Sequence, residues 1–152
     1  MVSAEQAVAA VPDPEIPVLT IADLGMLREV RVNADNSADV TVIPTYTGCP
    51  AMETIAADIQ AALAALGIAP ARVHIALSPA WSTEMISPAG RAKLAEYGIA
   101  PPPPAHAPAT PPACPRCGAG EAELLSPFGS TACKSLWRCR ACREPFDLFK
   151  CH

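Results

Sequence analysis

Apolar and polar positions along the first third of the chain follow the spacings of a short helix and two strands. Residues 3–6, Ser-Ala-Glu-Gln, form a capping-box pattern, which predicts a helix that ends before Pro12. Apolar and polar residues alternate over 27–32 and over 39–43, and the polar residues between these runs suit a hairpin turn. We therefore expect one helix and two antiparallel strands.

The following segment has the periodicity of an amphipathic helix, a strand and another helix. Pro50 suits the first residue of a helix, and apolar residues then recur at intervals of four and three until Gly67. These apolar residues are Ile55, Ile59, Leu63 and Leu66. Residues 73–77 alternate again and predict a third strand, and Ser87 before a proline suits the start of a last helix.

The order of these elements favours an α+β fold. A hairpin followed by a helix and a further strand is typical of a small three-stranded mixed sheet packed with helices on one side. We expect this domain to span residues 1–100. His74 falls on the polar side of its strand, where we expect it to be solvated.

Residues 101–112 separate this domain from the rest of the chain. The segment between Ile99 and Cys114 holds seven of the eighteen prolines and little that could form a core. Such a segment favours polyproline II geometry, with a rise of about 3.1 Å per residue. We expect a semi-rigid linker between the first domain and a small second domain over residues 113–152.

The second domain contains two Cys-x-x-Cys pairs, Cys114 with Cys117 and Cys139 with Cys142. The 21 residues between the pairs are close to the spacing of a four-cysteine zinc site. Four thiolates leave no open coordination position, so the zinc is expected to be structural and part of the fold of this zinc ribbon. A four-cysteine iron–sulfur cluster uses the same atoms and stays an alternative.

Three further residues of the second domain have side chains that can bind metals. Cys133, Cys151 and His152 lie outside the two tight pairs. The two cysteines are either buried thiols that act as small apolar residues, or ligands of a second metal, or replacements for one pair in the zinc site.

Cys49 is the one cysteine before the proline-rich segment, and it directly precedes the predicted helix at Pro50. Unpaired amides at a helix N-terminus stabilise a thiolate, so the position predicts a lowered pKa and a nucleophile or soft-metal ligand. A helix cap or a partly buried thiol is the other interpretation. Asp13, Glu15 and Asp23 gather in a proline-rich loop, where carboxylates commonly act as turn formers.

Charge and hydropathy narrow the classes of function. The net charge is −4; residues 1–100 carry five basic against eleven acidic side chains, and residues 113–152 carry six against four. An acidic chain is unsuited to wrapping nucleic acid. No run reaches the roughly 18 apolar residues of a membrane helix, and the start, which contains Glu5, does not resemble a signal peptide. We expect a cytoplasmic protein, whose paired cysteines stay reduced.

Several motifs together resemble a known family. Residues 13–17 (Asp-Pro-Glu-Ile-Pro), 21–27, 45–50 and 79–83 are similar to the SufT-like domain of iron–sulfur assembly factors, a resemblance that covers about residues 4–98. The cysteine-rich tail is similar to the zinc ribbon of the D-subunit family of bacterial phenylacetyl-CoA epoxidase systems.

The resemblance implies an accessory component without catalysis of its own, in aerobic phenylacetate degradation. In such systems a di-iron oxygenase epoxidises the ring, and a reductase with flavin and an iron–sulfur cluster supplies electrons. The implied role is maturation or insertion of the iron–sulfur or di-iron centre, with the reductase as main partner. Cys49, Asp13 and Glu15 would handle iron or a transient cluster, shared in a homodimer or with the client.

Two other classes of function stay open. The ribbon could serve only as an interaction or scaffold module. Alternatively, Cys49 could act with Cys133 or Cys151 as a thiol oxidoreductase. No Ser-His-Asp order, phosphate-binding loop or dinucleotide glycine pattern is present, which favours a helper protein over an enzyme.

Overall fold

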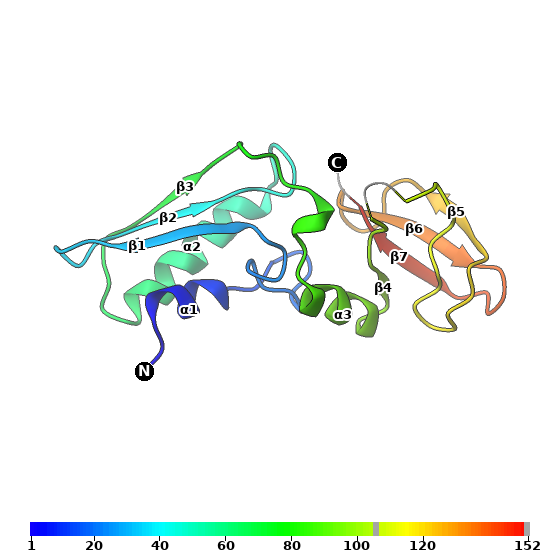
Figure 1. Cartoon of the computed structure of the whole chain (residues 1–152), viewed down its shortest axis with the longest axis horizontal. Coiled ribbons are helices and arrows are strands. Elements are labelled where there is room, and N and C mark those ends of the chain that lie inside the picture. Colours follow the sequence, from blue (N-terminus) through cyan, green and yellow to red (C-terminus); the bar gives the residue numbers. More distant parts are fainter. Residues whose placement is uncertain (105–106, 151–152) are drawn as a thin grey trace. The chain divides into compact units, whose positions relative to one another are not determined.

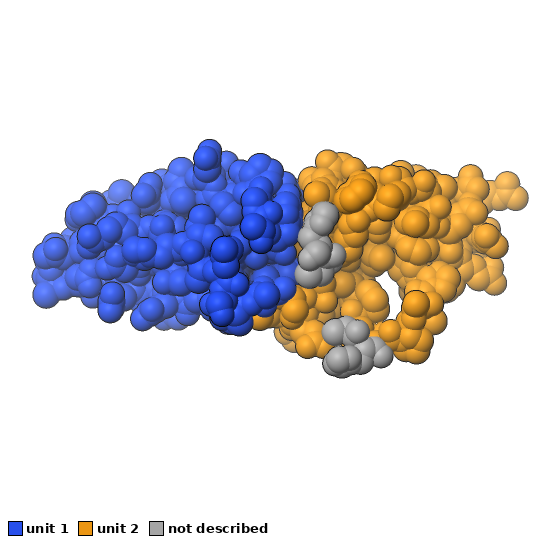
Figure 2. Space-filling view, turned by 90° about the horizontal axis from the view of Figure 1, so that it is seen from above, with its two compact units in different colours: residues 1–81 blue, residues 82–152 orange. Residues whose placement is uncertain are grey.

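The computed structural model describes residues 1–104 and 107–150. The chain forms two compact units, residues 1–81 and residues 82–152 (Figure 2). The first unit contains α1 (Ala4–Ala9), β1 (Leu27–Val32), β2 (Ala38–Val42), α2 (Ala51–Ala64) and β3 (Ala71–Ile75). None of the helices in the described part of the chain has the length and apolar character needed to cross a bilayer.

The first unit confirms the predicted α+β fold. β2 lies between its neighbours, antiparallel to β1 and parallel to β3, so the three-stranded sheet is mixed. Both helices lie on the same face of this sheet (Figure 1). Alternate residues of β2 follow that arrangement, because Ala38, Val40 and Val42 are buried while Asp39 and Thr41 are partly exposed.

Local sequence signals account for the helix ends. The Ser3 hydroxyl accepts a hydrogen bond from the Gln6 backbone at 3.1 Å, and the Gln6 side chain accepts one from the Ser3 backbone at 3.0 Å, as a capping box requires. In α2, Ile55, Ile59 and Leu63 are fully buried. Leu66, predicted to continue this face, is 40% exposed because the helix ends at Ala64.

His74 is exposed, as expected, but it is also paired. Its Nε2 lies 3.0 Å from Oδ1 of Asp39, and the same oxygen lies 3.2 Å from Nε of Arg72. The side-chain amide of Asn33 donates to the other oxygen of Asp39 at 2.9 Å. The hydrogen bond with His74, followed by that from Asn33, lowers the pKa of Asp39 to about 2. This polar network occupies the open face of the sheet.

The second unit is a four-stranded sheet preceded by two short helices. The helices are η1 (Thr83–Met85) and α3 (Pro88–Glu96), and the strands are β4 (Ile99–Ala100), β5 (Ala122–Ser126), β6 (Lys134–Cys139) and β7 (Pro145–Phe149). The strand order is β4-β7-β6-β5, with β4 parallel to β7 and the other pairs antiparallel. Its small core consists of Ala100, Cys114, Ala122, Cys139 and Phe146.

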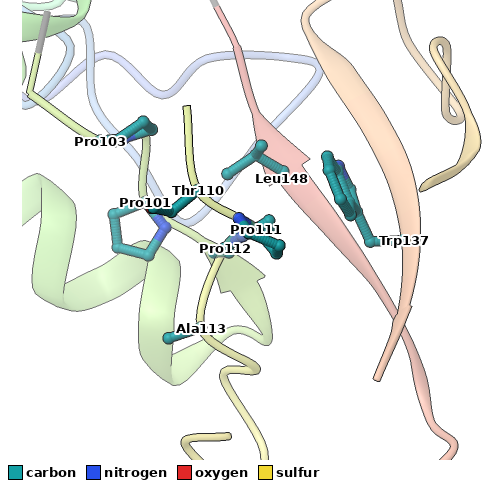
Figure 3. A pocket seen from close by; sticks show the side chains of 9 residues that line it. Pro101, Pro103, Thr110, Pro111, Pro112, Ala113, Trp137 and Leu148 are labelled. Atoms are coloured by element: carbon teal, nitrogen blue, oxygen red, sulfur yellow. The ribbon is translucent and has the colours of Figure 1, made fainter. Parts of the chain in front are cut away.

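The predicted linker differs from a free spacer. Ile99, placed by the sequence in the first domain, pairs with Asp147 of β7. Described prolines on both sides of residues 105–106 line a cavity of about 370 Å³ together with Trp137 and Leu148 (Figure 3). Proline rings are apolar and form no ladder hydrogen bonds, so they can pack against an aromatic side chain without forming a strand. The described positions of this segment therefore belong to the second unit.

Candidate metal centre and thiol site

Two turns bring the four predicted ligands Cys114, Cys117, Cys139 and Cys142 together, with their sulfur atoms all within 4.8 Å of one another. The distance between sulfur atoms is 3.8 Å for Cys114 and Cys142 and 3.6 Å for Cys117 and Cys139. A tetrahedral zinc ion with Zn–S bonds of about 2.3 Å requires sulfur separations of about 3.8 Å. The donor set therefore fits a single tetrahedral ion.

Backbone hydrogen bonds fix the first of these turns. The Gly118 amide donates to the Cys114 carbonyl at 2.8 Å, and the Cys114 amide donates to the Ala119 carbonyl at 2.9 Å. Gly118 has a φ of 77°, in the left-handed region that glycine adopts without steric cost. A glycine thus stands where this turn needs a left-handed residue.

The pKa values of Cys139 and Cys142 are shifted in opposite directions. The backbone amide of Cys142, 3.5 Å from the Cys139 sulfur, is the main reason why the pKa of Cys139 is lowered to about 7. The Glu144 amide favours a thiolate at Cys142, but desolvation and the neighbouring sulfurs outweigh it and raise the pKa of Cys142 to about 12. A cation at the centre would replace the protons, because metal ligation requires thiolates.

Cys133, the described alternative ligand, does not join this cluster. Cys133 is buried, and its sulfur lies 3.0 Å from the Thr131 hydroxyl. Among the residues that the structure describes, the compact sulfur group contains four cysteines and not Cys133. Cys151 and His152, the other predicted alternatives, lie outside the described residues.

Cys49 precedes α2 and is separated from its first residue, Ala51, by the N-cap residue Pro50. Its backbone amide donates to the Tyr46 carbonyl at 3.3 Å, and its side chain is 9% exposed. The predicted lowering of its pKa is wrong. Burial raises the pKa of Cys49, and although the Ala51 amide favours the thiolate, the negative charges of Glu15 and Asp13 oppose it.

The acidic loop is held by its own carboxylates. Oδ1 of Asp13, which is 7% exposed, accepts hydrogen bonds from the amides of Glu15 and Ile16 at 2.9 and 2.8 Å. Asp23 and Thr20 cap each other, each side chain accepting from the backbone of the other at 3.0 and 3.1 Å. The expected turn-forming role therefore holds for these contacts, while the charges of Asp13 and Glu15 also reach Cys49.

One contributor to the thiol site was missed in the sequence. A side-chain hydrogen bond with Tyr46 favours the thiolate of Cys49. The available signal was its position three residues before Cys49, which is the span of a tight turn. The proximity of Asp13 and Glu15 to Cys49 could not be predicted from the spacing of these residues in the sequence, because it depends on how the loop packs against the start of α2.

The raised pKa of Cys49 predicts slow alkylation at neutral pH. Since the thiolate is the reactive form, the rate of iodoacetamide modification of Cys49 should be low near pH 7.5 and should rise at higher pH in the folded protein than in the unfolded chain. Peptide mapping by mass spectrometry would follow Cys49 separately. In the urea-unfolded protein the same cysteine should titrate near the ordinary value of about 8.5. A native profile with its midpoint below that of the unfolded chain would contradict the assignment.

Comparison with known proteins assigns the two halves of the chain to different domain families. Residues 3–75 match the family described as iron-sulfur cluster assembly protein, and residues 100–150 match the PaaD zinc beta ribbon domain. Over 144 residues the chain is 49% identical to the D-subunit of the putative 1,2-phenylacetyl-CoA epoxidase of Escherichia coli (strain K12), covering 93% of this chain and 87% of that relative.

Two further similar proteins match a smaller part of the chain. An Fe-S protein maturation auxiliary factor of Porphyromonas gingivalis is 34% identical over 76 residues, which cover 49% of this chain and 71% of the relative. A solved structure of a domain of unknown function, DUF59, from Bacillus anthracis has a TM-score of 0.55 and 28% identity, covering 60% of this chain and 87% of that one. The α+β unit is thus found in relatives that are matched without the ribbon.

Proposed function

Because the chain belongs to the D-subunit family of 1,2-phenylacetyl-CoA epoxidases, we propose that it is an accessory component that assists maturation or insertion of a metal centre in that system. The centre is the iron–sulfur cluster of the reductase or the di-iron site of the oxygenase. The chain performs no epoxidation itself. Its partners are the other components of the system, and the flavin-containing reductase is the main client.

The observation that carries this proposal is the position of Cys49. A buried thiol lies at the start of α2, and the carboxylates of Asp13 and Glu15 are close enough to raise its pKa. An iron cation offsets the charge repulsion that disfavours the thiolate, so iron binding and loss of the thiol proton are coupled. When iron leaves, the proton returns, and this reversibility suits transient holding of iron or of a cluster.

One thiol per chain cannot complete a cluster of the kind held by four cysteines. We therefore propose that a second copy of the chain or the client supplies the other ligands. The four-cysteine site has a different role, because four ligands to one ion leave no open position for exchange. Zinc there is structural and holds the ribbon.

The alternative of a thiol oxidoreductase is disfavoured by the same observation. Such an enzyme needs an attacking thiolate near neutral pH, whereas burial raises the pKa of Cys49. Cys133, one of the two partners considered for it, is also a buried thiol, and Cys151, the other, lies outside the described residues.

The proposal is tested by the iron content of the client. The reductase is purified from cells that produce it together with the other components and either the wild-type chain or the Cys49→Ala variant. We expect iron and sulfide per flavin to fall to the level of cells that lack the chain. Cys133→Ala, which removes another buried thiol, should leave them unchanged. Equal iron in the reductase with wild-type and Cys49→Ala chains would refute the role of Cys49.

A further inference from the structure

A basic pocket lies beside the four-cysteine cluster in the second unit. Its volume is about 360 Å³, and it is lined by Glu123, Arg138, Cys139, Arg140 and Arg143. The lining therefore contains three arginines and one carboxylate. The pocket lies outside the features assigned above, because a zinc ribbon needs the sulfur of Cys139 but none of the arginines.

The pocket already holds a carboxylate of its own chain. Nε and Nη2 of Arg138 both donate to Oε1 of Glu123, with Nε at 2.7 Å, and Nη2 of Arg140 lies 3.6 Å from the other oxygen. The planar guanidinium matches a carboxylate better than a lysine ammonium does. Glu123 therefore shows which chemical group this pocket accepts.

Arg143 is the member of the pocket that Glu123 leaves without a partner among the described residues. It directly follows Cys142, as Gly118 directly follows Cys117 in the first turn. The φ angles of Arg143 and Gly118 are 65° and 77°, so an arginine occupies a backbone position that glycine adopts without steric cost. A cationic side chain at a backbone position that suits glycine is a second observation in favour of a binding site.

The surroundings of the pocket suit an extended protein segment. β5, which carries Glu123, is the last strand of its sheet, so no described strand pairs with its outer edge, where an extended segment can add. Leu124 and Leu125, which follow Glu123, are about half exposed. An apolar edge next to a cationic pocket fits a polypeptide with acidic side chains better than a small phosphate ligand.

We propose that Arg138, Arg140 and Arg143 bind side-chain carboxylates of an acidic, extended segment of a protein partner, laid along the edge of β5. This docking site goes beyond the proposed function and does not depend on Cys49. It assigns these three arginines to partner binding, and zinc to holding them in place.

The test uses the full-length zinc-loaded chain and a fluorescent peptide of alternating Glu and Ser. Fluorescence anisotropy should show binding that weakens with salt, and the matching Gln-Ser peptide should not bind. Arg143→Gln should weaken binding about tenfold, the range expected for loss of a charged hydrogen bond. Arg116→Gln, which removes an exposed arginine outside the pocket, should have no effect.

A second variant separates binding from folding. Arg143→Gly should weaken peptide binding as much as Arg143→Gln does. It should leave the melting temperature unchanged or raise it, because glycine adopts the left-handed φ at this position without steric cost. No binding of the Glu-Ser peptide, or equal binding by the Arg143→Gln and Arg116→Gln variants, would overturn the proposal. Displacement of the peptide by pyrophosphate at lower concentration than by free Glu-Ser peptide would also overturn it, in favour of a phosphate site. If peptide binding fails while the iron content of the reductase still depends on Cys49, the docking site is refuted and the proposed function stands.

Discussion

Replacing Cys139 by Ser should abolish zinc binding and unfold the sheet of the second unit. Cys139 is fully buried and belongs to a small core with few large side chains. In small zinc domains the metal contributes about 10–16 kcal/mol of apparent binding free energy, and this energy is also folding free energy. The remaining three thiols and a hydroxyl would bind zinc far more weakly. We expect the zinc content to fall to a small fraction of one ion per chain. Backbone amide hydrogen exchange in β6 and β7 should become fast.

Cys133→Ser is the matched control for this prediction. It changes a buried cysteine that directly precedes β6, and its sulfur contacts the Thr131 hydroxyl and does not belong to the four-cysteine cluster. Zinc content and protection from exchange should both be retained. Treatment of the wild-type chain with a strong chelator should reproduce the Cys139→Ser result, while the first unit keeps its exchange protection. An ordered second unit without metal would show that its apolar core alone is sufficient.

Replacing Asp13 by Ala should destabilise the first unit by about 1–3 kcal/mol, the cost of leaving buried hydrogen-bonding groups without a partner. Asp13 accepts the amides of Glu15 and Ile16 and is 7% exposed, so solvent does not readily replace it. Asp13→Asn keeps an acceptor oxygen in the same place, so its free energy of unfolding should fall much less than that of Asp13→Ala. Urea unfolding followed by hydrogen exchange in β1 and β2 would measure both variants.

The same pair of variants separates the structural and electrostatic roles of Asp13. Because its negative charge contributes to the raised pKa of Cys49, Asp13→Asn should lower that pKa. In an alkylation profile the thiolate would then appear at lower pH than in the wild-type protein. Equal destabilisation by Ala and Asn would instead show that the charge, and not the acceptor, stabilises the loop.

The sequence predicted those parts of the structure that depend on local patterns. The capping box at Ser3, the strand over 27–32 and the buried face of α2 all follow from residues within one or two turns of each other. The gathering of four sulfur atoms was also predictable, since each Cys-x-x-Cys pair is a local turn and the interval between pairs is that of a ribbon.

Features that depend on packing between distant segments were not predictable. The pKa of Cys49 follows from burial and from carboxylates more than thirty residues away, which outweigh the local effect of the helix N-terminus. The proline-rich segment shows the same limit, because Pro101 and Pro112 look like spacer residues until Trp137 and Leu148 are placed beside them. Likewise, the left-handed backbone at Arg143 becomes visible only in the structure.

Stable zinc in the ribbon and transient iron at Cys49 are the two roles proposed for metals in this chain, and metal analysis of the purified protein tests this division most directly. After anaerobic reconstitution with iron and sulfide, zinc and iron are counted per chain in the wild-type protein and in the Cys49→Ala variant. We predict one zinc in both proteins and chelatable iron in the wild-type protein alone. Iron with sulfide in the four-cysteine site, or equal iron in the Cys49→Ala variant, would contradict this division.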